Sequence, residues 1–194
     1  ECLLTTSINE GFGFAFLESW TAGQLLSGRK LPAICRDFEE NGVRLDHLYE
    51  RLAVPLTAFD ESLFFKQWQA CLKKNARQFG IEMDAAWLST RYREMTRDGS
   101  NDFGLLNEAF QQQVISRVLA DFCLRRAIRG SNPALAHLTN VPDQADRIAT
   151  NREAVLSAYH QSTYRDRLLT IYRKVTETRV CQRIDKTRLA AEFL

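Results

Sequence analysis

The opening of the sequence joins a strand-like run, a glycine loop and a helix-like run, and this order constrains the fold more than any other feature. Residues 2–7, Cys-Leu-Leu-Thr-Thr-Ser, have the apolar and β-branched composition of a buried strand. Residues 8–13 supply turn chemistry through two glycines. Residues 14–22 then place large apolar side chains at helical spacing, before Gly23 ends the helix: Phe16, Leu17 and Trp20.

The same order of elements repeats once. Residues 24–27 form a second short apolar run, and Pro32 suits the first position of a helix over residues 32–42. Alternating strands and helices favour parallel strands joined by helical crossovers. The loops at residues 9–13 and 28–31 are therefore predicted to lie at the carboxyl ends of neighbouring strands, where such sheets bind ligands.

Helical patterns dominate the remainder of the chain. A short helix is expected over residues 45–52 and an extended stretch over residues 54–56, and Asp60 is expected to cap a long helix that ends at Gly80. No strand signal follows Gly80. The later helices are expected over residues 84–97, 105–129, 133–138, 144–159 and 162–176.

Composition excludes several classes of protein. The 194 residues carry 26 basic and 24 acidic side chains, so the formal charge of +2 gives no argument for nucleic acid or an anionic membrane as partner. No apolar run is long enough to span a membrane. The cysteines lack a Cys-x-x-Cys pair, which predicts a cytoplasmic chain without disulfides or a metal site, its cysteines buried as small hydrophobic residues: Cys2, Cys35, Cys71, Cys123 and Cys181.

The first glycine loop combines anion-binding and hydroxyl-binding chemistry. Gly11 and Gly13 expose backbone amides near a helix start, and such amides favour phosphate. Glu10 in the loop and Glu18 about one turn into the helix are acceptors for paired hydroxyls, so the spacing suits a nucleotide sugar. The alternative is an ordinary helix start that Glu10 stabilises, with Glu18 merely exposed.

The segment Ser7-Ile-Asn-Glu10-Gly-Phe-Gly-Phe-Ala-Phe-Leu-Glu18 resembles the Glu-x7-Glu motif of family 4 glycosyltransferases, over about the first 60 residues. The resemblance implies retaining enzymes of two Rossmann-like domains (GT-B). The resemblance implies that Glu10 is the catalytic residue and contacts the donor sugar. It also implies that Gly11, Phe12 and Gly13 lie beside the transferred group and the phosphates, and that Glu18 binds the ribose.

This resemblance also implies an organisation for the chain. We expect a partial Rossmann-like nucleotide-sugar-binding domain over residues 1–80 and a helical extension packed on it over residues 81–194. The first strand lacks a preceding cap or turn, so we expect a fragment whose N-terminal domain, with the basic pair that holds the diphosphate in relatives, is missing. Arg29 is the local candidate to supplement that pair. A solvated loop arginine is the alternative.

The sequence departs from the family after Glu18, where Ser19-Trp20-Thr21-Ala22-Gly23 replaces the usual Ala-Met-Ala-x-Gly. The donor therefore stays open. We expect transfer of a hexose from a nucleoside diphosphate sugar to an unknown acceptor, without a cofactor, and little activity from the fragment alone. The alternatives are a noncatalytic helical interaction module with a degenerate start, and a retaining glycosyl phosphorylase.

Other side chains carry weaker signals. His47, His137 and His160 stand outside any metal-ligand pattern, so surface or helix-capping roles are expected. Seven aromatic residues have core spacing: Phe64, Phe65, Trp68, Trp87, Tyr92, Phe110 and Phe122. Tyrosines and arginines between residues 152 and 173 raise the alternative of a nucleic-acid surface, but interspersed acidic residues favour a mixed, solvated helical surface.

Overall fold

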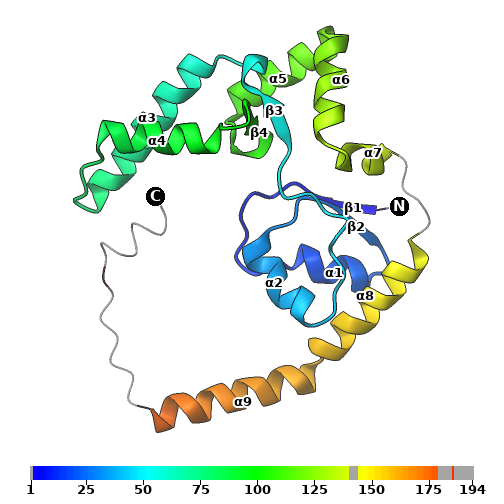
Figure 1. Cartoon of the computed structure of the whole chain (residues 1–194). Helices are drawn as coiled ribbons and strands as arrows, with labels where there is room; N and C mark the ends of the chain where they lie inside the picture. Colours follow the sequence, from blue (N-terminus) through cyan, green and yellow to red (C-terminus); the bar gives the residue numbers. More distant parts are fainter. Residues whose placement is uncertain (1, 140–143, 179–184, 186–194) are drawn as a thin grey trace. The chain divides into compact units, whose positions relative to one another are not determined.

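The chain forms two units in a computed structural model that describes residues 2–139, 144–178 and 185 (Figure 1). Unit 1 comprises Glu1–Leu52 and Arg129–Arg179. Unit 2 comprises Ala53–Ile128 and Val180–Leu194. Residues 53–128 are therefore inserted between the two segments of unit 1. Each unit is described below by itself.

Unit 1 begins with the predicted strand, helix and strand. β1 (Cys2–Thr5) pairs in parallel with β2 (Leu25–Gly28), and α1 (Ala15–Thr21) connects them. α2 (Pro32–Glu40) follows, with Pro32 in its first turn. Parallel strands joined by a helical crossover are thus confirmed. Thr5 lies opposite Gly28 at the carboxyl end of the pair, so the two following loops leave the same edge.

Two local expectations for unit 1 are wrong. The prediction that the first strand is buried is wrong, because three of the four residues of β1 are exposed: Cys2, Leu3 and Leu4. β1 pairs with β2. Residues 45–52 do not form a helix, because Tyr49 instead makes a parallel bridge to Arg29. The Tyr49 amide donates to Gly28 O at 3.0 Å, and the Lys30 amide donates to Tyr49 O at 2.7 Å. Backbone pairing with β2 therefore extends this segment.

The pairing of β1 with β2 depends on the absence of a side chain at Gly28. A Cβ built there would lie 1.9 Å from the backbone oxygen of Thr5, and the residue has a φ of +121°. Just beyond, the amide of Arg29 donates to the same Thr5 oxygen at 2.9 Å. Only glycine combines this approach with this backbone conformation.

The core of unit 1 draws on both of its segments. α8 (Ala145–Ala158) packs on α1, and Val155 of α8 belongs to the same buried cluster as Phe16, Trp20 and Leu26. α7 (Ala134–Thr139) precedes α8, and α9 (Gln161–Glu177) follows it. The fully buried Asn151 of α8 binds the backbone of Arg44 twice, accepting from its amide at 2.7 Å and donating to its carbonyl at 3.0 Å.

Arg147, near the start of α8, makes a second polar link to the first segment. Its guanidinium donates to both carboxylate oxygens of Asp46, at 2.6 and 3.2 Å, and lies 3.2 Å from Nδ1 of His47. Because arginine only donates, Nδ1 accepts, and Nε2 of His47 donates to the carbonyl of Leu26 at 2.7 Å. The hydrogen bond from Arg147 lowers the pKa of Asp46 to about 2.

Unit 2 contains a small antiparallel sheet and several helices. β3 (Ala53–Pro55) pairs with β4 (Ser100–Asp102). Short 3-10 helices, Leu56–Ala58 and Phe103–Leu105, follow the two strands. The α-helices are α3 (Glu61–Gln78), α4 (Ala85–Met95), α5 (Glu108–Ala120) and α6 (Phe122–Ser131), the last of which continues into unit 1.

An aromatic cluster forms the core of unit 2. The ring centroids of Phe59, Phe64 and Phe110 lie 5.4 to 5.9 Å apart in edge-on arrangements, and Tyr92 lies 6.3 Å from Phe64. Burial, followed by interaction with Glu61, raises the pKa of Tyr92 to about 12. Core roles for Phe64, Tyr92 and Phe110 are confirmed. Phe122 is 68% exposed and Trp87 is 38% exposed, so their predicted core roles are wrong.

Helix boundaries in unit 2 show where local side chains act. Asp60 caps α3 by accepting from the Leu63 amide at 2.9 Å, as predicted. The expected single helix over residues 105–129 is wrong, because Asp121 accepts from the amides of Cys123 and Leu124 and starts α6 there. The expectation that no strand follows Gly80 is also wrong, since β4 lies beyond it.

The structure confirms a helix-dominated α/β chain with few strands. Contacts divide it differently from the predicted domains 1–80 and 81–194, because α3 packs within unit 2 and α8 within unit 1. Sequence order could not indicate that unit 1 returns after the insertion. In the part of the chain that the structure describes, no helix is long and apolar enough to cross a membrane.

Replacing Gly28 by alanine should destabilise the protein by roughly 3 kcal/mol or more, because a methyl group would overlap the Thr5 oxygen and the backbone would be strained. Urea unfolding measures the loss. Gly130→Ala is the control, since a Cβ there meets nothing within 4 Å in a helix. Equal stabilities of the two variants would contradict the close approach.

Replacing Asp46 by asparagine should lower stability by about 1 kcal/mol near pH 7, a modest value because Asp46 is largely exposed. The pKa of Asp46 is lowered, so its stabilisation is present above its ordinary value near 4 and is lost as pH falls toward 2. Thermal unfolding of both proteins from neutral to acid pH should therefore show converging stabilities. A difference independent of pH would contradict the ion pair.

Candidate functional site

The candidate site lies in the loop that connects β1 to α1. Glu10, in this loop, is half-buried. Its charge contributes to raising the pKa of the Cys35 thiol of α2, although burial is the main cause. The loop after β1 therefore lies beside α2, the helix that follows the second strand.

Gly13 fixes the loop against α2. It has a φ of +68°, and a Cβ built there would lie 2.4 Å from Cγ2 of Ile34 and 3.2 Å from the ring of Phe38. A side chain at this position would push the loop away from α2. Gly11 differs, because a Cβ there meets nothing within 4 Å. Of the two predicted glycines, only Gly13 has a packing reason to be glycine.

The start of α1 offers backbone donors. The amide of Phe16 donates to Gly13 O at 2.9 Å, and the amide of Glu18 donates to Phe14 O at 2.8 Å. Within the described residues, the amides of Phe14 and Ala15 have no acceptor. Phe14 is the N-cap and makes no side-chain cap bond, and α1 has only 7 residues. The donors therefore belong to a short loop and helix start rather than to a long helix.

The two glutamates occupy different elements, as predicted, with Glu10 in the loop and Glu18 exposed on α1. In the described structure no hydrogen bond or ion pair joins their side chains, and neither carboxylate caps α1. The alternative, in which the charge of Glu10 stabilises the helix start and Glu18 is merely exposed, needs no capping contact and stays a prediction. Glu10 is available for a ligand.

Aromatic side chains surround the loop. Phe12 is 79% exposed and Phe14 is 60% exposed, and their rings stack with centroids 5.8 Å apart. Leu4 and Ile8 add further exposed apolar surface. The predicted role of Phe12 involves its backbone, and these contacts leave that role untested.

Arg29 lies at the carboxyl end of β2 and is buried rather than solvated. Its Nη1 donates to the carbonyl of Glu50 at 2.7 Å, and its guanidinium carbon lies 5.5 Å from the centre of the Tyr49 ring. The alternative of a solvated loop arginine is therefore wrong. Its proposed contact with phosphate stays a prediction, because the guanidinium already binds protein groups.

Sequence reasoning missed Lys30, the second cation at this edge. Its ammonium lies 2.8 Å from Glu39 and 3.9 Å from Glu50, and the hydrogen bond to Glu39 raises its pKa. The Gly-Arg-Lys run directly after the second strand was the available signal.

The other predicted candidates divide clearly. His160 caps α9 by accepting from the Ser162 amide, as expected, whereas the half-buried His47 links the Leu26 carbonyl to Arg147. The side chain of His137 lies outside the described residues.

Cys35 is buried as predicted, but the prediction is wrong for Cys2, Cys71 and Cys123, which are exposed; Cys181 is not among the described residues. No described cluster of side chains could hold a metal ion.

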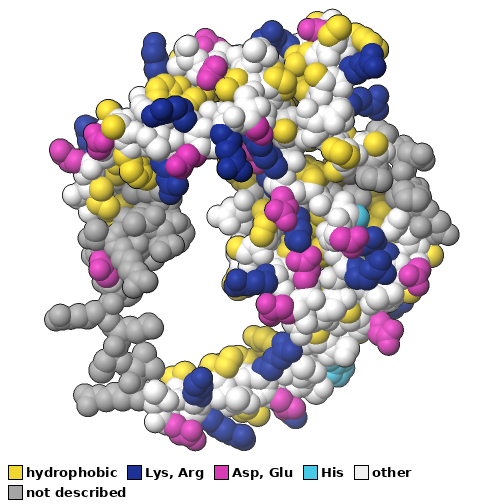
Figure 2. Space-filling view, viewed as in Figure 1, with side chains coloured by type: hydrophobic (Ala, Val, Ile, Leu, Met, Phe, Trp, Pro, Cys, Tyr) yellow, Lys and Arg dark blue, Asp and Glu magenta, His cyan; other side chains and the backbone are white. Residues whose placement is uncertain are grey.

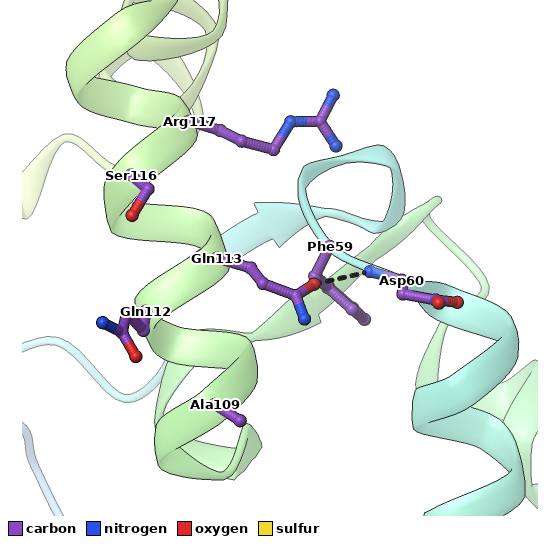
Figure 3. Close-up of a pocket in the computed structure, with 7 residues that line it drawn as sticks. All are labelled: Phe59, Asp60, Ala109, Gln112, Gln113, Ser116 and Arg117. Atoms are coloured by element: carbon purple, nitrogen blue, oxygen red, sulfur yellow. Dashed lines mark hydrogen bonds between the residues drawn. The ribbon is translucent and has the colours of Figure 1, made fainter.

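A separate open pocket of about 700 Å³ lies in unit 2, beside the start of α3 and along α5 (Figure 3). The backbone amide of Asp60 donates to Oε1 of Gln113 at 3.0 Å across this pocket, and Arg117 donates to the carbonyl of Thr57. These polar groups bind one another and close the start of α3 onto α5. The pocket lining is Phe59, Asp60, Ala109, Gln112, Gln113, Ser116 and Arg117.

Comparisons with known proteins add no assignment: no protein-family model, curated protein or solved structure matches the chain. The interpretation of the site therefore depends on its own residues and on the resemblance of the segment from Glu10 to Glu18.

Replacing Arg29 by lysine should lower stability by about 2 kcal/mol, because lysine keeps the charge but cannot both bond the Glu50 carbonyl and stack on Tyr49. Urea unfolding without ligand provides the measurement, with the exposed Arg36→Lys as control. Unchanged stability of the Arg29 variant would mean that its contacts to Glu50 and Tyr49 contribute little to folding.

Proposed function

We propose that this chain carries the donor-binding part of a retaining glycosyltransferase, which transfers a hexose from a nucleoside diphosphate sugar to an acceptor. The supporting observation is the parallel β1–α1–β2 unit, because it presents the Glu10 loop at the carboxyl edge where α/β sheets bind ligands. A glycine-anchored loop with free backbone donors and two carboxylates suits a ligand with phosphate between two sugars.

Each part of the site has a task in this proposal. Amides of the loop and of the start of α1 bind the diphosphate. Glu10 accepts hydroxyls of the transferred sugar and positions it, and Glu18, one turn into α1, accepts the ribose hydroxyls. Gly11, where a Cβ would meet nothing within 4 Å, keeps the backbone accessible to the donor, and the buried Gly13 holds the loop on α2.

Stabilising the leaving group is the main chemical requirement. When the bond between the sugar and the diphosphate breaks, negative charge develops on the phosphate oxygen, and each preorganised donor can contribute roughly 3 kcal/mol to lowering the barrier. Arg29 and Lys30 lie at the same edge but already bind Glu50 and Glu39. We therefore propose that further positive charge comes from outside this chain, from another domain of the same protein.

Donor binding tests the proposal. Titration of the chain with UDP-, GDP- and ADP-hexoses, followed by calorimetry or by ligand-observed NMR, should detect one preferred donor. Glu10→Gln and Glu18→Gln should each weaken its affinity about tenfold, because each loses a charged hydrogen bond worth roughly 1.5 kcal/mol. Glu18→Gln should also lower the affinity for the free nucleoside diphosphate, whereas Glu10→Gln should leave that affinity unchanged.

Glu40→Gln is the matched control, because Glu40 is an exposed glutamate at the end of α2. Circular dichroism establishes that all three variants fold. If the Glu10 and Glu18 variants bind the preferred donor as tightly as the Glu40 variant does, the carboxylates do not hold the donor. The assignment of the site would then fail.

A further inference from the structure

α9 is a long helix that has no buried side chain. By contrast, α2, α3, α4, α5, α6 and α8 each bury at least one residue. α9 nevertheless carries large apolar side chains, with exposures from 43% to 60%. These residues are Tyr164, Leu169, Ile171, Tyr172 and Val175.

The apolar residues of α9 include a narrow seam, Tyr164, Leu168, Ile171 and Val175, at spacings of four, three and four. This is the a/d spacing with which one helix packs along another. Tyr164 and Ile171 take d positions, and Leu168 and Val175 take a positions. A strand or an irregular loop would not match a straight seam of this kind.

Cations border the seam. Arg167 and Lys174 take the two g positions. Arg165 takes an e position and pairs with the neighbouring Asp166 at 3.3 Å, and Tyr172 takes the other e position. Asp166 and Glu177 lie on the opposite face, together with Arg173. The Arg167 side chain also donates a hydrogen bond to the Asn41 side chain at the end of α2, so this side of α9 faces α2. Figure 2 shows hydrophobic side chains exposed along α9 with Lys and Arg side chains among them.

We propose that the seam of α9 binds an amphipathic helix of a partner protein that carries Asp and Glu beside its own apolar seam. Charge complementarity selects this occupant. In an antiparallel second copy, Arg167 would face Lys174, which disfavours self-association. An anionic membrane fits less well, because Asp166 and Glu177 would be repelled by its negative charge.

A helical peptide provides the probe. A synthetic amphipathic helix with leucines at the same spacing and glutamates at its e and g positions should bind the full chain. A peptide identical except for glutamines at those positions should bind about tenfold more weakly. Raising the salt concentration from about 0.05 M to 0.5 M should lower the affinity for the acidic peptide and leave the affinity for the neutral peptide unchanged. Fluorescence anisotropy measures both.

Variants of the seam locate the binding surface. Ile171→Ser combined with Val175→Ser should lower the affinity for the acidic peptide at least about tenfold. Arg165→Gln combined with Lys174→Gln should lower this affinity about fivefold. Ile115→Ser, at a similarly exposed residue of α5, should have no effect. The four substituted residues of α9 are exposed, so circular dichroism should be unchanged.

Three results would overturn the proposal. The acidic and neutral peptides could bind equally or not at all. Sedimentation could show a dimer that the Ile171→Ser and Val175→Ser variant abolishes, which would make a second copy the occupant. Finally, the chain could float with vesicles of anionic phosphatidylglycerol and lose that association in the same variant, which would make α9 a membrane-surface helix.

Discussion

The parallel pairing of β1 with β2 is the contact on which the rest of unit 1 depends. It requires the Thr5 carbonyl to approach the backbone at Gly28, and it sets the direction in which both following loops leave the sheet. The loop with Glu10 then meets α2 through Gly13, and Arg29 meets Tyr49 through the continued pairing. The candidate site is thus a consequence of one close backbone contact.

The two segments of unit 1 are joined by polar contacts as well as by the apolar core. Asn151 satisfies the backbone of Arg44, and Arg147 reaches Asp46 and His47. Each of these contacts fixes the register of α8 on the first segment, because hydrogen bonds require geometry that apolar contacts do not. α1 is therefore enclosed by elements from both ends of the chain.

Local signals in the sequence predicted the first half of unit 1 well. Pro32, Gly23 and the apolar spacing of α1 define their elements through nearby contacts, so β1, α1, β2 and α2 appear where expected. The wrong predictions concern segments whose structure depends on backbone pairing with residues distant in the sequence. Residues 45–52 follow β2 because Tyr49 finds backbone partners there, and β4 forms because β3 lies opposite.

The candidate site could be predicted only in part, for the same reason. The positions of Glu10, Gly13 and Glu18 follow from the strand, loop and helix order. The burial of Arg29 does not, because it depends on Glu50 and Tyr49, which reach it through tertiary contacts. The return of α8 to unit 1 left no signal in the sequence, since a helix pattern does not say which core it joins.

The insertion has a consequence for how the chain folds during synthesis. The hydrogen bonds between Arg44 and Asn151 join residues 107 positions apart, whereas β3 and β4 pair within residues 53–128. Ribosomes add roughly 5 to 20 residues per second, so the first segment waits several seconds for α8. During that interval the face of α1 that later packs against α8 remains uncovered.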